Sequence, residues 1–434
     1  MPRYERGKMT TKPFSRSYLI VVIGMLMLLS LLNLADKELL AAVAPAIKVN
    51  LELDDGHLGL IRSTVFLTAI VGAFIWGPLA DRWKRKNVLA LGATCWSAVT
   101  WLTAYATGFG TLAAARGGMS FFESCFSPSA YSLITDVVPR ARRGLILGLL
   151  GITYPLGTIL ALLVGGLVGE ANWRLPFLYF GIPGVLLGLA VLAFVREPRR
   201  GASEDAVLEA QGVYTGRFSM AELKRALRTR TLLLIYLLDA CEGAVFFSLS
   251  FWAPNYLMTY RIAPDLLTAD MALLPAIVGF VCGSLLGGVL TDRLRGRLPN
   301  AAAWVSFIAM AGGFLIALVM FNVFSLTAVM AVAFVLGMTG YMILPTITIM
   351  MYDIVSPETK ATAMAGDGVV LGLVSAGASA GIGLLSRQLQ DLRLAFGGAC
   401  LFFLAAGAIL ALIIARRITA DMQDQEKLVK SRVA

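Results

Sequence analysis

Charged residues are scarce in this chain. Only 15% of its 434 residues are Asp, Glu, Lys or Arg, whereas 58% are hydrophobic. Soluble domains carry about 25% charged residues. The scarcity argues against a soluble protein, and the long apolar runs that replace the missing charges favour a chain that crosses a membrane repeatedly.

The groups that most enzymes rely on are also few. The single histidine, His57, is expected where a loop meets a helix, which excludes histidine-centred catalysis inside the membrane. The sequence has no Gly-x4-Gly-Lys-Ser/Thr loop for a nucleotide, and its five cysteines fall in predicted spans without metal-ligand spacing. We therefore expect no cofactor, no metal and no enzymatic activity. A membrane enzyme acting on lipids would need paired metal ligands or a Ser/His arrangement.

Apolar runs of spanning length predict an all-α integral membrane protein. A transmembrane helix needs about 20 predominantly apolar residues. The sequence predicts twelve such helices, at residues 17–47, 58–80, 87–108, 110–136, 144–168, 174–195, 231–258, 268–291, 299–321, 325–352, 360–385 and 393–415.

The net charge of +10 orients these helices. Most Lys and Arg residues fall in the tails, in the loops after even-numbered helices and in the linker, as the positive-inside rule requires. We therefore predict a multi-pass protein of the cell (inner) membrane with both termini in the cytoplasm. The first apolar run is too long for a signal-peptide core, so it is expected to remain as the first helix. The basic excess does not indicate nucleic-acid binding.

Two motifs occur twice. The stretch Gly77-Pro-Leu-Ala-Asp-Arg-Trp-Lys-Arg85 recurs as Gly288-Val-Leu-Thr-Asp-Arg-Leu-Arg-Gly-Arg297, and Asp136-Val-Val-Pro139 is echoed by Asp353-Ile-Val-Ser-Pro357. The two offsets are nearly equal, which indicates a duplicated chain. The predicted organisation is an N-terminal six-helix bundle (1–195), a cytoplasmic linker (196–230), a C-terminal six-helix bundle (231–416) and a cytoplasmic tail (417–434). Duplicated halves with a site between them are the plan of a secondary transporter.

Several ionisable residues lie within the first half's spans, where they are costly and usually functional. At roughly 1.5 Å per helical residue, Asp36, Arg62 and Arg116 should lie at similar height, with Glu123 deeper on the face of Arg116. An acid binds its proton less tightly beside an arginine than in apolar surroundings. If a conformational change moves Arg116 relative to Asp36 or Glu123, the proton affinity of these acids changes with the conformation, and proton binding is coupled to the conformational change. The alternative is a static ion cluster that holds helices together.

The first helix of the second half, like that of the first half, contains acidic residues. Asp239 and Glu242 are three residues apart and so share a helix face, and Phe247 follows one turn later. In the first half, Phe122 precedes Glu123. The predicted substrate-binding residues, which would line a roomy apolar cavity, are Arg62, Phe122, Asp239, Glu242 and Phe247.

The duplicated Gly-x-x-x-Asp-Arg-x-x-Arg/Lys loop resembles the signature of the major facilitator superfamily. Within it, three stretches resemble the Spinster-like branch: Asn33-Leu-Ala-Asp-Lys37, Arg116-Gly117 with Glu123, and Trp173-Arg-x-Pro-Phe177 through Gly181-x-Pro-Gly184 to Arg196-Glu-Pro-Arg-Arg-Gly201. Ser120 and Phe122 replace two glycines of the branch pattern, and Lys37 replaces an arginine. The resemblance implies twelve helices in two pseudo-symmetric halves, alternating access and a lipid-like substrate of the lysophospholipid or sphingoid type, driven by protons.

The resemblance also implies that the duplicated loops latch the two halves together at the cytoplasmic side. A carboxylate at a helix end can accept from the N-terminus of a neighbouring helix, and the arginines can reach acids nearby. The predicted gating residues are Asp81, Arg82, Arg85, Asp136, Asp292, Arg293, Arg297 and Asp353.

Other transport reactions fit the same residues. An organic-anion/proton symporter would use Arg62 or Arg116 on the substrate carboxylate, and a multidrug/proton antiporter would use Asp239 and Glu242 on cations. The predicted partners are a small amphipathic or organic substrate, protons and membrane lipids, with no nucleic acid, and the chain is expected to act as a monomer.

Overall fold

The structure is a computed structural model that describes residues 16–138, 140–197, 229–322, 325–355 and 360–430. Its regular secondary structure in these ranges is helical. The N-terminal half comprises α1 (Arg16–Asn50), α2 (Asp55–Arg82), α3 (Arg85–Thr103), α4 (Phe109–Glu123), α5 (Phe126–Val137), α6 (Arg140–Val164), the π-helix η1 (Gly165–Gly169) and α7 (Arg174–Phe194). The C-terminal half comprises α10 (Arg230–Thr259), α11 (Leu266–Met271), α12 (Leu274–Arg295), α13 (Ala301–Met320), α14 (Leu326–Tyr341), α15 (Ile343–Ile354), α16 (Lys360–Leu389) and α17 (Leu392–Lys430).

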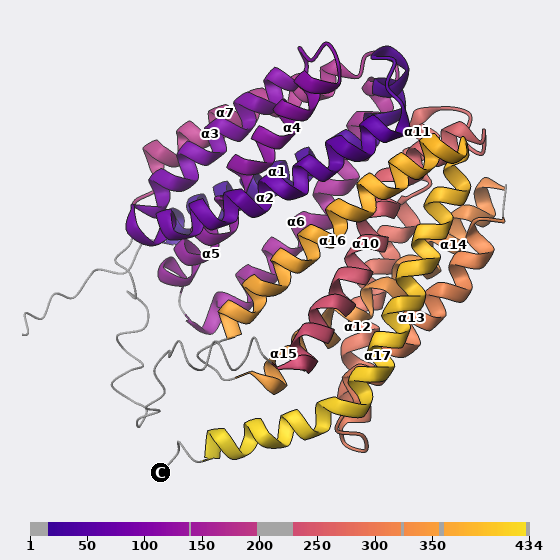
Figure 1. Cartoon of the computed structure of the whole chain (residues 1–434). Helices are drawn as coiled ribbons and strands as arrows, with labels where there is room; N and C mark the ends of the chain where they lie inside the picture. The colour runs from indigo at the N-terminus through magenta and orange to yellow at the C-terminus, as the bar shows by residue number, and fades with distance from the viewer. Residues whose placement is uncertain (1–15, 139, 198–228, 323–324, 356–359, 431–434) are drawn as a thin grey trace, which may run out of the picture.

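These elements match the twelve predicted spans one for one. Ten described helices or joined helix pairs are long and apolar enough to cross a membrane. The remaining two spans are α3 and the pair α4–α5. Most of the predicted linker, 196–230, lies outside the described residues. The last helix, α17, continues to Lys430, well past the boundary predicted at residue 416, and Figure 1 shows its final part running outside the bundle.

Two spans at equivalent places in the two halves are each divided into two helices. The sequence predicted both spans as continuous helices. The break between α4 and α5 falls at Ser124 and Cys125, and the break between α14 and α15 falls at Met342. Pro128 and Pro345 follow them at the offset that relates Asp136 to Asp353. Proline cannot donate to the carbonyl four residues earlier and its ring clashes with that carbonyl. The duplicated prolines therefore account for the paired breaks.

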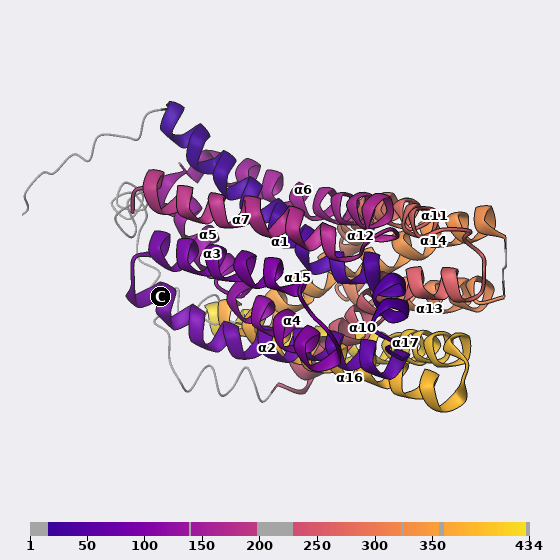
Figure 2. The same ribbon diagram turned by 90° about the horizontal axis from the view of Figure 1, so that it is seen from above.

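The two halves lie side by side, as both views show (Figures 1 and 2). The contacts between them include α1 with α10, α2 with α16, and α11 with α6–η1 and α1. We call the end of the bundle that carries the loops near residues 52, 106, 171, 263 and 390 the outer end, and the opposite end the inner end, following the orientation predicted from the basic loops.

Side-chain bonds between the halves gather toward the outer end. Asp55, at the start of α2, accepts from Asn255 Nδ2 (3.1 Å) and Ser386 Oγ (2.5 Å), and also binds Lys48 Nζ (2.5 Å) of its own half. Ser63 Oγ donates to the Ala376 carbonyl (2.5 Å), and Arg387 pairs with Asp54 (3.2 Å). This structure is therefore tied shut at its outer end.

Two glycines allow α2 and α16 to approach each other closely. A Cβ added at Gly59 would collide with the Ser379 carbonyl oxygen, and one at Gly383 would collide with the Asp55 carbonyl oxygen. Small residues let helices approach backbone to backbone in membranes, where packing drives association. The outer closure thus depends on these two positions having no side chain.

Candidate functional site

The predicted pair Asp36 and Arg116 meets inside the N-terminal half. Arg116 Nη1 donates to Asp36 Oδ1 (2.9 Å), and its Nη2 donates to the Asp36 backbone carbonyl (2.7 Å). Thr100 Oγ1 donates to the second carboxylate oxygen, and Phe177 lies under the guanidinium at 5.5 Å. Arg116 is completely buried and Asp36 nearly so. This is a desolvated, charge-assisted pair, which is among the strongest kinds of hydrogen bond in proteins.

Glu123 differs because its carboxylate has no hydrogen-bond partner in the described part of the chain. It is the last residue of α4, at the break before α5, and is buried. Neither carboxylate oxygen has a hydrogen-bond donor among the described residues. Lys37, Asp36, Arg116 and Arg62 are close enough to act on it electrostatically. An ionised carboxylate is costly to bury without hydrogen bonds, so Glu123 is suited to carry a proton in this conformation.

Arg62 of α2 lies among aromatic rings from both halves. Its guanidinium carbon is 5.2 Å from the Phe66 ring, 6.0 Å from Phe247 and 5.4 Å from Phe251. Its Nη1 donates to the Lys37 carbonyl (3.2 Å), and its Nη2 is 3.9 Å from Glu38. The predicted residues Arg62 and Phe247 are therefore in contact across the interface between the halves.

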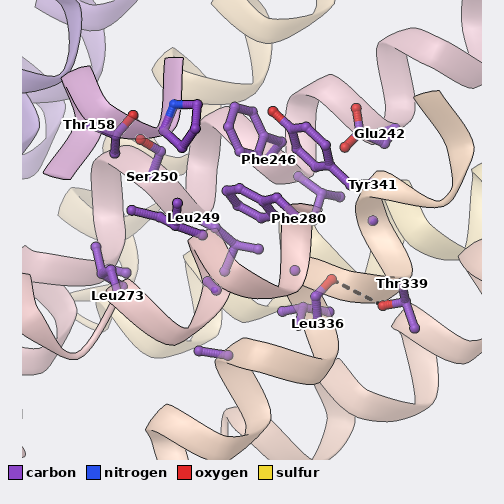
Figure 3. A pocket seen from close by; sticks show the side chains of 18 of the residues that line it. Thr158, Glu242, Phe246, Leu249, Ser250, Leu273, Phe280, Leu336, Thr339 and Tyr341 are labelled. Atoms are coloured by element: carbon purple, nitrogen blue, oxygen red, sulfur yellow. Dashed lines mark hydrogen bonds between the residues drawn. The ribbon is translucent and has the colours of Figure 1, made fainter. Parts of the chain in front are cut away.

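An apolar cavity lies between the halves (Figure 3). Its wall combines Tyr154 and Thr158 of α6 with Phe246 of α10, Phe280 of α12 and Tyr341 of α14. The four rings touch one another, and Phe280 stacks on Tyr341 at 4.3 Å. Two carboxyl groups also reach the wall, Glu38 from α1 and Glu242 from α10. Each comes from the first helix of its half.

The cavity is small in this conformation. Its volume is about 80 Å³, whereas sites that bury drug-sized ligands measure roughly 300–1,000 Å³. Glu38 also accepts a hydrogen bond from Ser250 of the opposite half, which holds the wall together. A substrate with a long tail would have to part the halves here.

Among the predicted substrate-binding residues, Glu242 reaches this wall, while the others occupy different places in the described structure. Phe122 packs against Trp76 (6.0 Å) and Phe121 (5.2 Å) in the core of the N-terminal half. Asp239 lies beside Asp367 of α16.

The first duplicated loop is bound within its own half. Arg85 is buried, pairs with Glu197 (2.9 Å) and donates to Ser132 of α5 (2.8 Å). Lys86 N also donates to Glu197 (2.9 Å). Arg82 is exposed at the end of α2. The side chains of Asp81 and Asp136 lie outside the described residues.

The second duplicated loop reaches its acid with a different arginine. Asp353 accepts from Arg295 at 2.7 Å on both oxygens, while Asp292, Arg293 and Arg297 are exposed. Arg295 lies between the two predicted arginines. The described loop contacts thus brace α3 against α5 and the segment after α7, and α12 against α15, within each half.

Asp292 remains our test of the predicted latch at the inner end. Asp292→Asn is expected to shift the resting population toward an open inner end, because it removes the charge that would face a helix N-terminus in the closed state. Spin labels at the exposed positions Phe194 and Leu298 would report the distance between the halves. Asp421→Asn in the tail is the control. Unchanged distances in Asp292→Asn would leave the loop with an orienting role alone.

Two residues that the sequence analysis did not assign join the site. Glu38 lines the cavity and contacts both Ser250 and Arg62. Asp367 lies beside Asp239. The sequence marks Glu38 and Asp367 as acids inside apolar spans. It does not reveal which partner each acid contacts.

A family model described as Major Facilitator Superfamily matches residues 26–365. The sphingosine-1-phosphate transporter SPNS2 of Danio rerio is 27% identical over 393 residues, covering 86% of this chain and 77% of that protein. An MFS-type efflux pump of Mycolicibacterium smegmatis is 28% identical over 422 residues, covering 93% and 94%. The crystal structure of a bacterial homologue of the human lysosomal transporter Spinster, inward-facing and unoccupied, superposes with a TM-score of 0.78 at 22% identity, covering 95% of this chain and 99% of that chain.

Proposed function

Because this chain belongs to the major facilitator superfamily of transporters, we propose that it is a proton-coupled secondary transporter that works by alternating access. The observation that carries the proposal is the contrast between two nearby buried acids. Asp36 is neutralised by Arg116, whereas Glu123 has no donor among the described residues. Movement of Arg116 from Asp36 toward Glu123 would exchange which acid binds a proton. We further propose an inner-membrane location, cytoplasmic termini and a monomeric state.

The contacts between the halves support alternating access. Bonds at Asp55, Ser63 and Asp54 hold the outer end closed. The described loop contacts of Arg85 and Arg295 stay within their own halves. This pattern suits a state that faces inward, from which the outer end opens once these cross-links separate.

We propose an amphipathic, lipid-like substrate whose head contains an ammonium group, such as an amine-bearing lysophospholipid or a sphingoid molecule. The ring wall of Phe246, Phe280 and Tyr341 suits an apolar tail, and Glu38 and Glu242 on the same wall suit an ammonium group. The similarity to a sphingosine-1-phosphate transporter supports a lipid-like substrate.

Export of apolar cations is the second candidate. The same carboxyl groups in an apolar wall would bind a cationic drug, and the similar efflux pump extends over nearly the whole chain. An organic-anion symporter would instead require Arg62, whose guanidinium is surrounded by rings and lies near Glu38.

Transport by purified protein in proteoliposomes tests these proposals. Labelled lysophospholipid, sphingoid base, cationic dye and small dicarboxylate would be compared with and without a pH gradient. Accumulation of lysolipid that depends on the gradient supports the proposal. Equal rates with and without the gradient would reject proton coupling, and accumulation of the dicarboxylate alone would favour the organic-anion symporter.

Phe246→Ala distinguishes the substrate classes. Its ring touches Tyr154, Phe280 and Tyr341 in the cavity wall. Loss of a buried ring removes roughly 1.5–3 kcal/mol of apolar burial, so the half-saturating lysolipid concentration should rise about tenfold or more. Phe402→Ala, which removes an exposed ring, is the control. Arg62→Lys should be the milder lesion for a lipid. If Arg62→Lys is more damaging than Phe246→Ala, the substrate is an anion instead.

A further inference from the structure

A buried acid at the outer end has no place in the proton switch described above. Asp270 lies in α11, and its relative exposure is 0%. Neither of its carboxylate oxygens has a hydrogen-bond partner among the described residues. An ionised carboxylate in such a place would lack both water and donors, which is very costly. In this conformation Asp270 therefore holds a proton.

The wall that buries Asp270 includes the opposite half. The helix α11 packs against η1, α6 and α1 of the N-terminal half. Leu267 and Met271, three residues before and one after Asp270, flank it, and Leu267 shares its helix face. A Cβ added at Gly166 of η1 would lie 2.7 Å from the Leu267 Cα, and Met271 packs with Ala42 and Leu162. Separation of η1 from α11 would therefore open this site.

Two acids near α11 form hydrogen bonds with partners other than Asp270. Glu170, directly after η1, accepts from Leu266 N (3.1 Å), and Asp265 caps α11 by accepting from Thr268 N (2.7 Å). In the outer halves of the other elements packed against α11, the ionisable groups are Asp36, Lys37, Glu38 and Lys48 of α1, Tyr154 of α6, Tyr256 of α10, and Tyr260 and Arg261 directly after α10. The Asp270 carboxylate forms no ion pair or hydrogen bond among the described residues.

We propose that Asp270 is a second proton-binding site, which loads from the outer side and ties closure of the outer end to protonation. The inference rests on the proposed proton-coupled function. When α11 and η1 separate, the carboxyl group meets external water and ionises by transferring its proton to water. A hydronium ion from outside restores the proton to a carboxylate oxygen and leaves water behind. Only the neutral acid can be enclosed again, so a low external pH favours closure.

This site is separate from the Asp36 and Glu123 pair, which lies on α1 and α4 in the other half. Two proton sites on different halves would let external protons act on the outer closure while Asp36 and Glu123 respond to the movement of Arg116. Asp270 then acts on the outer gate and need not touch the substrate.

Distance measurements across the outer end test this inference in full-length protein reconstituted in proteoliposomes, where the external pH is set separately from the internal pH. Spin labels at the exposed positions Val49 and Leu394 report the two halves, in a background without the five native cysteines. In the parent, the ratio of outer-open to outer-closed protein should rise with external pH. Asp270→Asn imitates the protonated acid, so it should favour closure. A plot of the logarithm of this ratio against external pH should have a slope smaller than that of the parent by about one, because one titrating proton contributes about one unit of slope.

Asp265→Asn is the matched control, because it keeps a capping side chain and changes an acid five residues away on the same segment. It should retain the slope of the parent. If Asp270→Asn does not fold, Asp270→Leu replaces the polar group with an apolar one of similar size and should lose the same slope. A slope equal to that of the parent in the folded variant overturns the inference. If the parent accumulates no substrate under a pH gradient, the proposed function fails instead, and the two outcomes are distinct.

Discussion

Glu123→Gln is expected to abolish proton-driven accumulation of substrate while leaving passive exchange intact. The Glu123 carboxylate is buried and has no donor among the described residues. Glutamine has nearly the same shape as the protonated acid but cannot release a proton. The variant should therefore fold and move substrate down its gradient, yet gain nothing from a pH gradient.

Accumulation and exchange would be measured in the same proteoliposomes. Asp424→Asn, which changes an exposed acid of the tail, should behave like the parent. If Glu123→Gln still accumulates substrate as the parent does, Glu123 is not the coupling acid. Asp36→Asn should also lose accumulation, but it leaves Arg116 buried beside a neutral partner. Breaking a buried pair costs about 3–5 kcal/mol, so lower stability is expected for Asp36→Asn and not for Glu123→Gln.

Gly383→Val should prevent closure of the outer end and stop the transport cycle. A Cβ at this position would strike the Asp55 carbonyl oxygen and lie 3.1 Å from the Gly59 Cα, so α2 and α16 could not approach. We expect substrate transport to fall by more than tenfold, because about 1.4 kcal/mol of added cost in the closed state already shifts its population tenfold. The label pair at Val49 and Leu394 should report a wider outer end.

Gly381→Val is the matched control for this change. It lies on the same helix, and a Cβ there would meet nothing within 4 Å. Both variants place one β-branched residue in α16, so their difference isolates the contact with α2. Equal behaviour of the two variants would show that the close approach at Gly383 is unnecessary for transport.

The sequence predicted the spans better than their interruptions. A run of apolar residues is a signal along the chain alone, so all twelve spans have counterparts in the structure. The breaks at Ser124 and Met342 were missed although Pro128 and Pro345 mark them, because proline is tolerated in many transmembrane helices where neighbouring groups take up the freed carbonyl. The repetition of the proline at one offset is the signal that could have revealed them.

The contact between Asp36 and Arg116 was accessible from sequence, because depth along two helices follows from residue counts. Which side of a helix faces a cavity was less accessible. Phe246 lines the wall while Phe247 contacts Phe66, since neighbouring helical residues point about 100° apart. Asp353 likewise meets Arg295, a choice that depends on how the loop leaves α12. Such choices are set by packing between helices that are distant in the sequence.

The bonds at Asp55 bear on how well the membrane is sealed during each cycle. One carboxylate binds Lys48 of α1, Asn255 of α10 and Ser386 of α16, while itself belonging to α2. The contacts of four helices therefore break together when Asp55 loses its partners. Partial separation would leave the Asp55 carboxylate buried without some of its hydrogen bonds. Cooperative separation of this kind disfavours half-open intermediates, through which water and ions would otherwise leak and dissipate the gradient.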